Sequence, residues 1–431
     1  MEFKKIILEN CVNDIIDYRG KTPKKLKGEW NEKGTFRAVS AKNIKNMQLV
    51  NLESLKKVDN ELYKKWMKKE VSKNDILLTS EAPLGESLFW DSDEKIVLSQ
   101  RVFGLKPNTD IVNPKYLFAY LQTPKFKHEL TSRESGTTVT GIRRKELEKT
   151  IIEVPSQNIQ KFIGDLFYIT NKKIKNNQNI IANLEELSQT LFKRWFVDFE
   201  FPDENGNPYK SSGGEMVDSE LGEIPKFWNV AKAEDIYKIT IGKTPPRKLT
   251  ELFSENEGID WVSISDMKTE GMFINHTKEK IVEEGIINYK VKVVPKGSVL
   301  LSFKLTIGRV KITNKELTTN EAIAHFFSDN MHQLYTYLYL KNFNFEYLGN
   351  TSSIATAINS KIVKKMPILV PKQRILTKFI NRVEPFMKSI DIVQCENIKL
   401  TQLRDTLLPK LMSGEIEIPD DIEVNEDELS I

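Results

Sequence analysis

Apolar residues recur at steps of three and four between residues 159 and 196, and this pattern predicts one long helix. At about 1.5 Å per residue the helix would be roughly 55 Å long. The apolar seam is narrow, which predicts that the helix packs against a partner helix. Apolar residues of the seam are Ile159, Ile163, Leu166, Ile180, Leu184, Leu187 and Leu191, and polar residues Thr170, Lys173 and Asn177 interrupt it.

The same pattern returns between residues 375 and 412, so the partner helix is expected in the same chain. The two stretches match at a constant shift of 216 positions, which places Leu187 opposite Leu403 in the alignment. Pro385 predicts a kink or a later start in the second helix. Two unrelated amphipathic helices are the alternative. The residues expected to pair the helices or to bind a partner are Ile163, Leu184, Leu187, Leu191, Trp195, Phe379, Leu400, Leu403 and Leu407.

The segments that precede the two helices also match each other. GKTP occurs at residues 20–23 and again at 242–245, and VSKNDILLTSEAPLG at 71–85 aligns without a gap to VPKGSVLLSFKLTIG at 294–308. Matches that keep their order indicate a duplicated unit of half the chain. Short β-like runs between turn residues predict mixed heads. We expect an α+β fold in which two repeated heads are separated by two long antiparallel helices that form a coiled coil, with approximate two-fold symmetry.

Six segments follow from this organisation. The stretch between the first helix and the second head is rich in Gly, Pro, Asn, Asp and Ser, which predicts a surface loop. The expected segments are a first head at 1–155, a helix at 156–197, a connector loop at 198–222, a second head at 223–371, a second helix at 372–413 and an acidic tail at 414–431.

The net charge of +4 combines a basic body with an acidic end. The tail carries eight acidic residues and no basic one, so the rest of the chain carries +12. That charge suits a polyanion such as DNA, although a lysine-rich solvated surface would also produce it. We expect the tail to be disordered.

The sequence lacks the motifs that several classes of enzyme and membrane protein require. The two GKT triplets have Ile15 and Tyr237 where a phosphate-binding loop needs glycine. The catalytic tetrapeptide of amino-methyltransferases is absent, and PDENG at 202–206 lacks the lysine of a nuclease motif. Two cysteines and four histidines show no metal-ligand spacing, and no apolar run of about 18 residues exists. We expect a cytoplasmic protein with no membrane span, no metal and no catalysis of its own.

The duplicated heads, the long helices, the GKTP turns and two further strings resemble the specificity subunit of type I restriction–modification systems. The strings are LGEIPKFW at 221–228 and LLPKLMSGEI at 407–416. The resemblance implies that the heads are target recognition domains which read an asymmetric, bipartite DNA sequence, and that the helices are spacers. It also implies a prokaryotic source, a role in phage defence, and an assembly with two methylation subunits and two restriction subunits. S-adenosylmethionine, ATP and Mg would then be bound by these partners, and adenine N6 would be methylated after base flipping.

Two other functions stay open at this point: a stand-alone, two-headed DNA-binding regulator, and a nuclease or methyltransferase with an unrecognised site. For DNA binding, the candidates are basic and polar residues in turns and loops, most of them matched between the heads. In the first head they are Lys21, Thr22, Lys24, Lys25, Ser40, Lys42, Asn43, Thr137, Thr138, Arg143 and Arg144. In the second head they are Lys243, Thr244, Arg247, Lys248, Ser263, Ser265, Lys304, Arg309 and Ser353.

Overall fold

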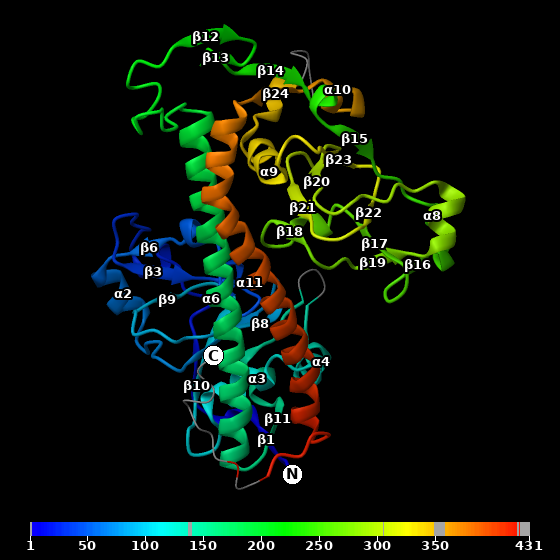
Figure 1. The fold of residues 1–431 in the computed structure, drawn as a ribbon. Helices are drawn as coiled ribbons and strands as arrows, with labels where there is room; N and C mark the ends of the chain where they lie inside the picture. The colour runs from blue at the N-terminus through cyan, green and yellow to red at the C-terminus, as the bar shows by residue number, and fades with distance from the viewer. Residues whose placement is uncertain (1, 137–139, 305, 349–357, 420–421, 423–431) are drawn as a thin grey trace. The chain divides into compact units, whose positions relative to one another are not determined.

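Both long helices exist and are continuous in the computed structural model (Figure 1). Helix α6 (Gln157–Phe196) has 40 residues and α11 (Gln373–Ser413) has 41. Helix α11 runs through Pro385, so the expected later start is wrong. Proline removes one backbone donor, and the fully buried side chains of Val383 and Ile390 hold the helix on both sides of it.

The chain forms two compact units, and each long helix contributes one end to each unit. Unit 1 is Met1–Ile174 with Leu400–Ile431, and unit 2 is Lys175–Lys399. Unit 1 therefore contains both ends of the chain. The structure describes residues 2–136, 140–304, 306–348, 358–419 and 422.

Unit 1 holds three sheets that belong to the first head and one short hairpin. A four-stranded sheet has the order β2-β10-β7-β8, a three-stranded sheet has the order β6-β3-β9, and β1 pairs with β11. The strands are β1 (Lys4–Ile7), β2 (Val12–Asp17), β3 (Phe36–Val39), β4 (Ile44–Lys45), β5 (Gln48–Leu49), β6 (Lys57–Val58), β7 (Ile76–Ser80), β8 (Leu84–Phe89), β9 (Val97–Leu98), β10 (Val102–Pro107) and β11 (Ile151–Val154).

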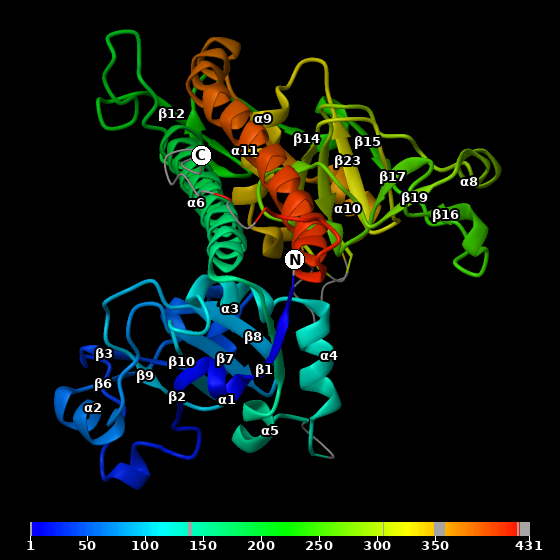
Figure 2. The ribbon, with the colours of Figure 1, turned by 90° about the horizontal axis from the view of Figure 1, so that it is seen from below.

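Short helices cover the sheets of unit 1 (Figure 2). Both α3 and α4 contact β8, and each begins with a capping side chain followed by proline: Asn113 Oδ1 accepts from two backbone amides of α3, and Thr123 Oγ1 accepts from Phe126 of α4. The helices are α1 (Leu8–Cys11), α2 (Asn60–Trp66), α3 (Pro114–Tyr120), α4 (Pro124–Ser132) and α5 (Arg144–Glu148), with 3-10 turns η1 (Lys24–Leu26), η2 (Ala41–Asn43) and η3 (Leu52–Ser54).

Unit 2 repeats this plan. A five-stranded sheet has the order β15-β23-β20-β21-β18, a four-stranded sheet has the order β16-β19-β17-β22, and β14 pairs with β24. Its strands are β12 (Met216–Ser219), β13 (Gly222–Pro225), β14 (Asn229–Lys232), β15 (Lys238–Ile241), β16 (Phe253–Ser254), β17 (Ile259–Val262), β18 (Phe273–Ile274), β19 (Glu279–Ile281), β20 (Val299–Ser302), β21 (Val310–Thr313), β22 (Thr318–Thr319), β23 (Ile323–Phe327) and β24 (Pro367–Val370). Its helices are α7 (Ala233–Ile236), α8 (Glu283–Tyr289), α9 (Gln333–Asn342) and α10 (Ser360–Lys365), with 3-10 turns η4 (Thr250–Leu252), η5 (Asp266–Lys268) and η6 (Phe345–Leu348).

The strand registers confirm the internal repeat. In unit 1, β3 pairs in parallel with β9, and Val39 lies beside Leu98. In unit 2, β17 pairs in parallel with β22, and Val262 lies beside Thr319. The heads are therefore two copies of one mixed α/β arrangement, as the duplicated sequence predicts.

The helices pair antiparallel, and polar contacts fill the polar break in the seam. In unit 2 the amide of Asn177, which is 2% exposed, donates to Glu396 Oε2 at 2.7 Å and to Asn397 Oδ1 at 2.9 Å. In unit 1 Arg404 donates to Asn171 Oδ1 at 2.8 Å. Buried polar groups paired in this way fix the register of one helix against the other.

The phase of the predicted seam is wrong at Ile180, Leu187 and Leu403. Leu187 is 49% exposed and Leu403 is 50% exposed, whereas Ile181 is buried. The helices also pack against their heads, so the buried face is wider than a two-helix seam and lies at a different angle. Of the other pairing candidates, Ile163, Trp195 and Phe379 are buried, and Leu184, Leu191, Leu400 and Leu407 are partly buried.

The connector contains more structure than its composition predicts. Strands β12 and β13 form an antiparallel pair, and Phe199 and Phe201 are buried against Trp228. The ring centroids of Phe201 and Trp228 lie 5.0 Å apart in a stacked arrangement. Two phenylalanines among turn residues anchor this segment to the core of unit 2.

Candidate nucleic-acid interface

Two of the segments predicted to bind DNA line one hollow of about 470 Å³ in unit 1. An adjoining hollow of about 490 Å³ shares Gln100 and Arg101 with it and is lined by Arg143, which comes from a third predicted segment. The predicted residues around the first hollow are Lys21, Thr22, Ser40, Lys42 and Asn43. Segments far apart in the sequence thus converge on one region of the first head.

The GKTP turn of the first head holds its own lysines. The Lys21 ammonium donates to the carbonyl of Trp66 at 2.7 Å and lies 4.1 Å from the ring centre of Tyr18. Burial, together with the charge of Lys68, lowers the pKa of Lys21. Lys25 donates to the carbonyl of Gly20 at 2.8 Å, and Lys24 is exposed. Lys21 therefore shapes the turn, and Thr22 lies beside it in the wall of the hollow.

The segment after β3 is a tight polar turn. Ser40 Oγ donates to Asn43 Oδ1 at 2.7 Å, and the Ser40 amide donates to the same oxygen at 3.2 Å. Asn43 is 1% exposed, so its side chain closes the turn from inside. Lys42 lies between them and is exposed. Asn43 thus closes the turn that carries Ser40 and Lys42, and little of its own side chain is exposed to the hollow that it lines.

A turn between β9 and β10, residues 99–101, lies at the boundary of both hollows, and we name it the corner turn. The Ser99 amide donates to the carbonyl of Val39 at 2.8 Å, which extends the parallel bridge into the turn. Arg101 has a φ of +65° and its Nε lies 3.0 Å from Glu81 Oε1. The Gln100 and Arg101 side chains are exposed.

Sequence reasoning missed the corner turn because it searched for residues that recur in both heads. Gln100 and Arg101 have no like residue in the second copy. The available signal was a Gln-Arg pair directly after a short apolar strand, since these two side chains are among those that read bases most often.

The loop between α4 and α5 forms the far wall of the second hollow. Ser135 and Gly141 exchange two backbone hydrogen bonds of 3.0 and 3.1 Å, which close the loop at its base. The Ile142 amide donates to the carbonyl of Ser80 at 2.9 Å. Arg143 is exposed beside this base. Thr137 and Thr138, which belong to the same loop, lie outside the described residues.

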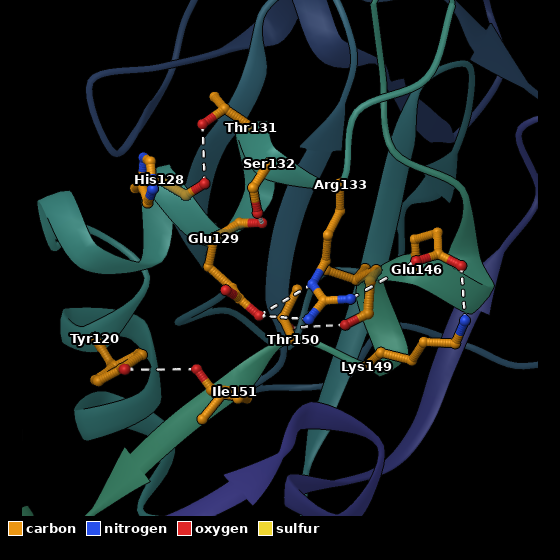
Figure 3. Close-up of polar contacts among 11 residues, drawn as sticks. Tyr120, His128, Glu129, Thr131, Ser132, Arg133, Glu146, Lys149, Thr150 and Ile151 are labelled. Atoms are coloured by element: carbon orange, nitrogen blue, oxygen red, sulfur yellow. Dashed lines mark hydrogen bonds and ion pairs between the residues drawn. The ribbon is translucent and has the colours of Figure 1, made fainter.

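A cluster of ion pairs fastens the two helices that flank this loop (Figure 3). Arg133, at the end of α4, lies 2.8 Å from Glu129 and 3.7 Å from Glu146 of α5. Glu146 also pairs with Lys149 at 2.8 Å. Arg144 pairs with Glu148 at 2.7 Å. Arg144 therefore pairs within α5, and of these two neighbouring arginines only Arg143 lines the hollow.

Arg19 ties the loop to the sheet from its other side. It donates to both carboxylate oxygens of Asp17 at 2.8 Å and to the carbonyl of Ile142 at 3.1 Å, and it lies 4.0 Å from the ring centre of Phe103. Burial raises the pKa of Asp17, but the hydrogen bonds and charge of Arg19 outweigh it and hold this pKa below its ordinary value.

The second head has a corresponding corner turn at residues 320–322. The Asn320 amide donates to the carbonyl of Val262 at 3.0 Å, as Ser99 does to Val39 in the first head. Thr244 of the second GKTP turn donates its hydroxyl hydrogen to a carboxylate oxygen of Glu321. That bond is the main cause that lowers the pKa of Glu321, and the charges of Lys304 and Arg247 add to it. Lys243 is exposed, and its amide donates to the carbonyl of Thr319 at 2.9 Å.

Other candidates of the second head are partly committed to internal contacts. Arg247 makes two bonds of 2.9 Å to Glu279 and lies over the rings of Phe253 and Trp261. Arg309 donates to the carbonyl of Ile264 at 2.6 Å. The remaining candidates are Ser263, which bonds Ser265 at 2.7 Å and Asp266 at 2.6 Å, and the exposed lysines Lys248 and Lys304. Ser353 lies outside the described residues.

The described part of the chain contains no cluster of three or more His, Cys, Asp or Glu side chains that could hold a metal ion. Within the same residues, every helix is too short or too polar to cross a membrane.

Comparisons with known proteins identify the repeated unit. The family model described as type I restriction modification DNA specificity domain matches twice, at residues 9–186 and 225–402. The HindI type I restriction enzyme specificity subunit of Haemophilus influenzae is 27% identical over 407 residues, covering 81% of this chain and 88% of that protein. The MjaIX specificity subunit of Methanocaldococcus jannaschii is 26% identical over 410 residues, covering 93% and 90%.

A solved structure shares the fold over nearly the whole chain. The crystal structure of the type I restriction–modification S subunit from M. genitalium matches with a TM-score of 0.61 at 15% identity, and it covers 98% of this chain and 97% of that one. The two family matches together span most of the sequence and coincide with the two structural repeats. The chain therefore belongs to the type I restriction–modification specificity family, and it is the non-catalytic subunit that recognises DNA sequence in such a system.

Proposed function

We propose that this chain reads an asymmetric, bipartite DNA sequence, one half-site per head, with a spacer of unread base pairs between them. The observation that carries the proposal is the convergence of the GKTP turn, the Ser40 turn and the Arg143 loop on two adjoining hollows in the first head. The target recognition domains would be residues 1–155 and 223–371. The segments 156–197 and 372–413 would be the spacers, 198–222 the connector and 414–431 an acidic tail.

The chemistry of the two hollows suits a DNA duplex. Exposed cations such as Lys24, Lys42 and Arg143 would contact phosphates and set the register of the head on the duplex. Hydroxyl and amide groups from Thr22, Ser40 and Gln100 are donors and acceptors that can contact base edges in the major groove.

The helices would set the distance between the half-sites. Helices of 40 and 41 residues are about 60 Å long by their rise. Major-groove sites on one face of DNA repeat every 34–36 Å or so, and a rigid spacer selects one such separation. The spacer length in base pairs would then be fixed and its sequence free.

Partner subunits would supply the chemistry. We place two methylation subunits, which transfer a methyl group from S-adenosylmethionine to adenine N6, and two restriction subunits, which use ATP and Mg, on this chain in a prokaryotic cytoplasm. Leu187 and Leu403 are half exposed at matching positions of the two repeats, so each offers a similar apolar contact. Equivalent contacts suit two copies of one partner.

The test is the methylome of the host, measured by single-molecule sequencing with and without this gene. Loss of N6-methyladenine from one split, asymmetric motif on deletion is the expected result. Co-purification of the tagged chain with a methylase is the matched biochemical readout. An unchanged methylome in a strain whose methylase is expressed and bound to the chain would overturn the proposal.

A further inference from the structure

The two corner turns occupy the same place in the repeated fold. In the first head Thr79 of β7 lies beside Val102 of β10. In the second head Ser302 of β20 lies beside Ile323 of β23. The alignment of residues 71–85 with 294–308 makes Thr79 and Ser302 equivalent.

This register assigns a counterpart to each residue of the corner turn. The Ser80 amide donates to the Arg101 carbonyl at 2.9 Å, and the Phe303 amide donates to the Ala322 carbonyl at 3.0 Å. Arg101 therefore corresponds to Ala322. One position earlier, Gln100 corresponds to Glu321. By the same alignment Glu81 corresponds to Lys304.

The two heads place opposite charges in the loop and in the corner turn, although Arg101 itself corresponds to Ala322 and Glu321 to Gln100. The first head has an acidic residue, Glu81, in the loop after β7 and a basic one, Arg101, in the corner turn, and they form an ion pair. The second head has a basic residue, Lys304, in the loop after β20 and an acidic one, Glu321, in the corner turn. The parallel bridge before the turn is shared, so the two turns lie at the same place in the fold and differ in the charges that they present.

In each corner turn a polar contact holds one charged side chain. Nε of Arg101 lies 3.0 Å from Glu81 Oε1, and the guanidinium has further donors on its two terminal nitrogens. Arg101 also adopts a left-handed backbone, which residues other than glycine rarely do, and such strain gathers at functional sites. Among the described residues, no partner of the Gln100 side chain is found. In the second head, Thr244 fixes the Glu321 carboxylate.

We propose that the corner turns are base-reading elements of opposite character, with Gln100 and Arg101 reading one half-site and Glu321 the other. This inference rests on the proposed function. Arginine pairs with O6 and N7 of guanine, and glutamine with N6 and N7 of adenine, so the first half-site contains purines at adjacent positions. A glutamate accepts from the N4 amino group of cytosine, so the second half-site contains a cytosine at the corresponding place.

Phosphate contact does not account for both turns. A carboxylate beside the DNA backbone is repelled by phosphate, so Glu321 is compatible with DNA only where it meets an amino group of a base. The charges of Lys304 and Arg247 help to lower the pKa of Glu321, and the exposed Lys304 would attract the phosphate backbone beside it.

The test uses the full chain with the methylation subunit of its own system, expressed in a host without other adenine methylation. The methylated motif is read by single-molecule sequencing for the wild-type chain and for Arg101→Ala and Glu321→Gln. The controls are Arg37→Ala, which removes another ion-paired arginine of the first head, and Glu284→Gln, which neutralises an exposed glutamate of α8.

Arg101→Ala is expected to lower the preference for guanine at one position of one half-motif by about 5- to 150-fold, the loss of one bidentate contact. Glu321→Gln is expected to relax a cytosine in the other half-motif, and both controls are expected to keep the full motif. If Arg101→Ala abolishes methylation altogether, Arg101→Gln, which keeps a polar side chain of similar reach, is expected to restore methylation with a relaxed or shifted position.

If the Arg101 and Glu321 variants both direct methylation of the unchanged wild-type motif, the inference is overturned and the proposed function is left intact. A wild-type chain that directs no methylation of a split motif, although bound to an active methylase, would overturn both.

Discussion

The first and second heads share their framework and differ where the framework ends. Corresponding sheets recur, with four and three strands in the first head and five and four in the second. The parallel bridges β3–β9 and β17–β22 lead into corner turns at the same place. Beyond the bridge, the first head presents Gln100 and Arg101, and the second presents Glu321. Burial fixes the strands because each buried side chain has many neighbours, whereas an exposed turn can change its residues at little cost to folding.

The comparison teaches that one scaffold can hold two different reading surfaces in one chain. A symmetric dimer of one head would read two identical half-sites. Fusion of two diverged copies removes that constraint, because each copy changes independently. The predictions below test whether the heads work together at a fixed distance, how far the framework depends on shared packing, and where the heads differ.

The largest effect is expected from a change in the DNA that breaks cooperation between the heads. Lengthening the spacer by one base pair displaces one half-site by about 3.4 Å and rotates it by about 35° around the helix axis. Both heads can then no longer bind, and affinity should fall about 10³-fold or more, toward the non-specific level. Titration of the assembled complex on duplexes with the two spacers measures it. A spacer of unchanged length and altered sequence is the control, and equal affinity for the two lengths would contradict a fixed separation.

Packing of the helix end on the second head comes next in size. Trp195 is buried, with ring centroids 5.6 Å from Phe379. Trp195→Ala should lower the free energy of unfolding by about 3–5 kcal/mol, because a large cavity remains in the core. Denaturant unfolding followed by circular dichroism measures the loss.

Leu187 on the same helix is the matched control, because it is half exposed. Leu187→Ala should cost less than about 1 kcal/mol and should instead reduce co-purification of the methylation subunit. If the Leu187 variant unfolds as readily as the Trp195 variant, our assignment of the buried face is wrong.

Single base changes in either half-site are expected to have intermediate effects. Each should cost about 1–3 kcal/mol of binding free energy, since one or two hydrogen bonds to a base edge are lost. Competition binding against the intact duplex at one fixed salt concentration measures it, because salt changes phosphate contacts strongly. Changes within the spacer should have almost no effect, and a spacer position as sensitive as a half-site position would contradict the division of the site.

The smallest expected effect is a pH dependence of folding stability that arises from one ion pair of the first head. Asp17 pairs with Arg19 in the first head. By the strand registers Ile241 takes the place of Asp17 in the second head, so this ion pair has no counterpart among the described residues there. The pKa of Asp17 is lowered from 3.8 in the folded state, so the pair stabilises the head above about pH 3.8 and this contribution disappears as pH falls through the lowered value.

The pair should contribute about 1 kcal/mol, since both side chains are partly exposed. Wild type should therefore exceed Asp17→Asn in stability at pH 6, and the difference should shrink toward pH 3. Denaturant unfolding at the two pH values measures it. A difference that grows on acidification would contradict the sign of the pKa shift.

The sequence predicts the repeat and both helices because each rests on a pattern that extends over many residues. The apolar period of the whole stretch outweighs one proline, and α11 runs through Pro385. The sequence does not predict which face of a helix is buried when a head and a second helix share that face, so Leu187 and Leu403 are placed wrongly in the seam. The sequence also does not predict that Phe199 and Phe201 anchor the connector, because turn residues dominate the composition of the connector.

The candidate site is predicted only as far as its residues repeat. Repetition finds the GKTP turns and the Ser40 and Ser263 turns, which line or adjoin the corner turns. Specificity requires that the heads differ, so a search for repeats passes over Gln100, Arg101 and Glu321. Sequence alone does not distinguish a buried amide that closes a turn from an exposed amide that binds a ligand, and Asn43, which is predicted to bind DNA, is 1% exposed in the turn that it closes.

The central claim is that each head reads its own half-site, and the most direct measurement is a titration of the complex on three duplexes. One carries the methylated motif, one has the first half-site scrambled, and one has the second half-site scrambled. The account predicts that each scrambled duplex binds at least about 100-fold more weakly than the intact one at the same salt concentration. Full affinity for either scrambled duplex would show that one head does not read DNA, and would contradict the account.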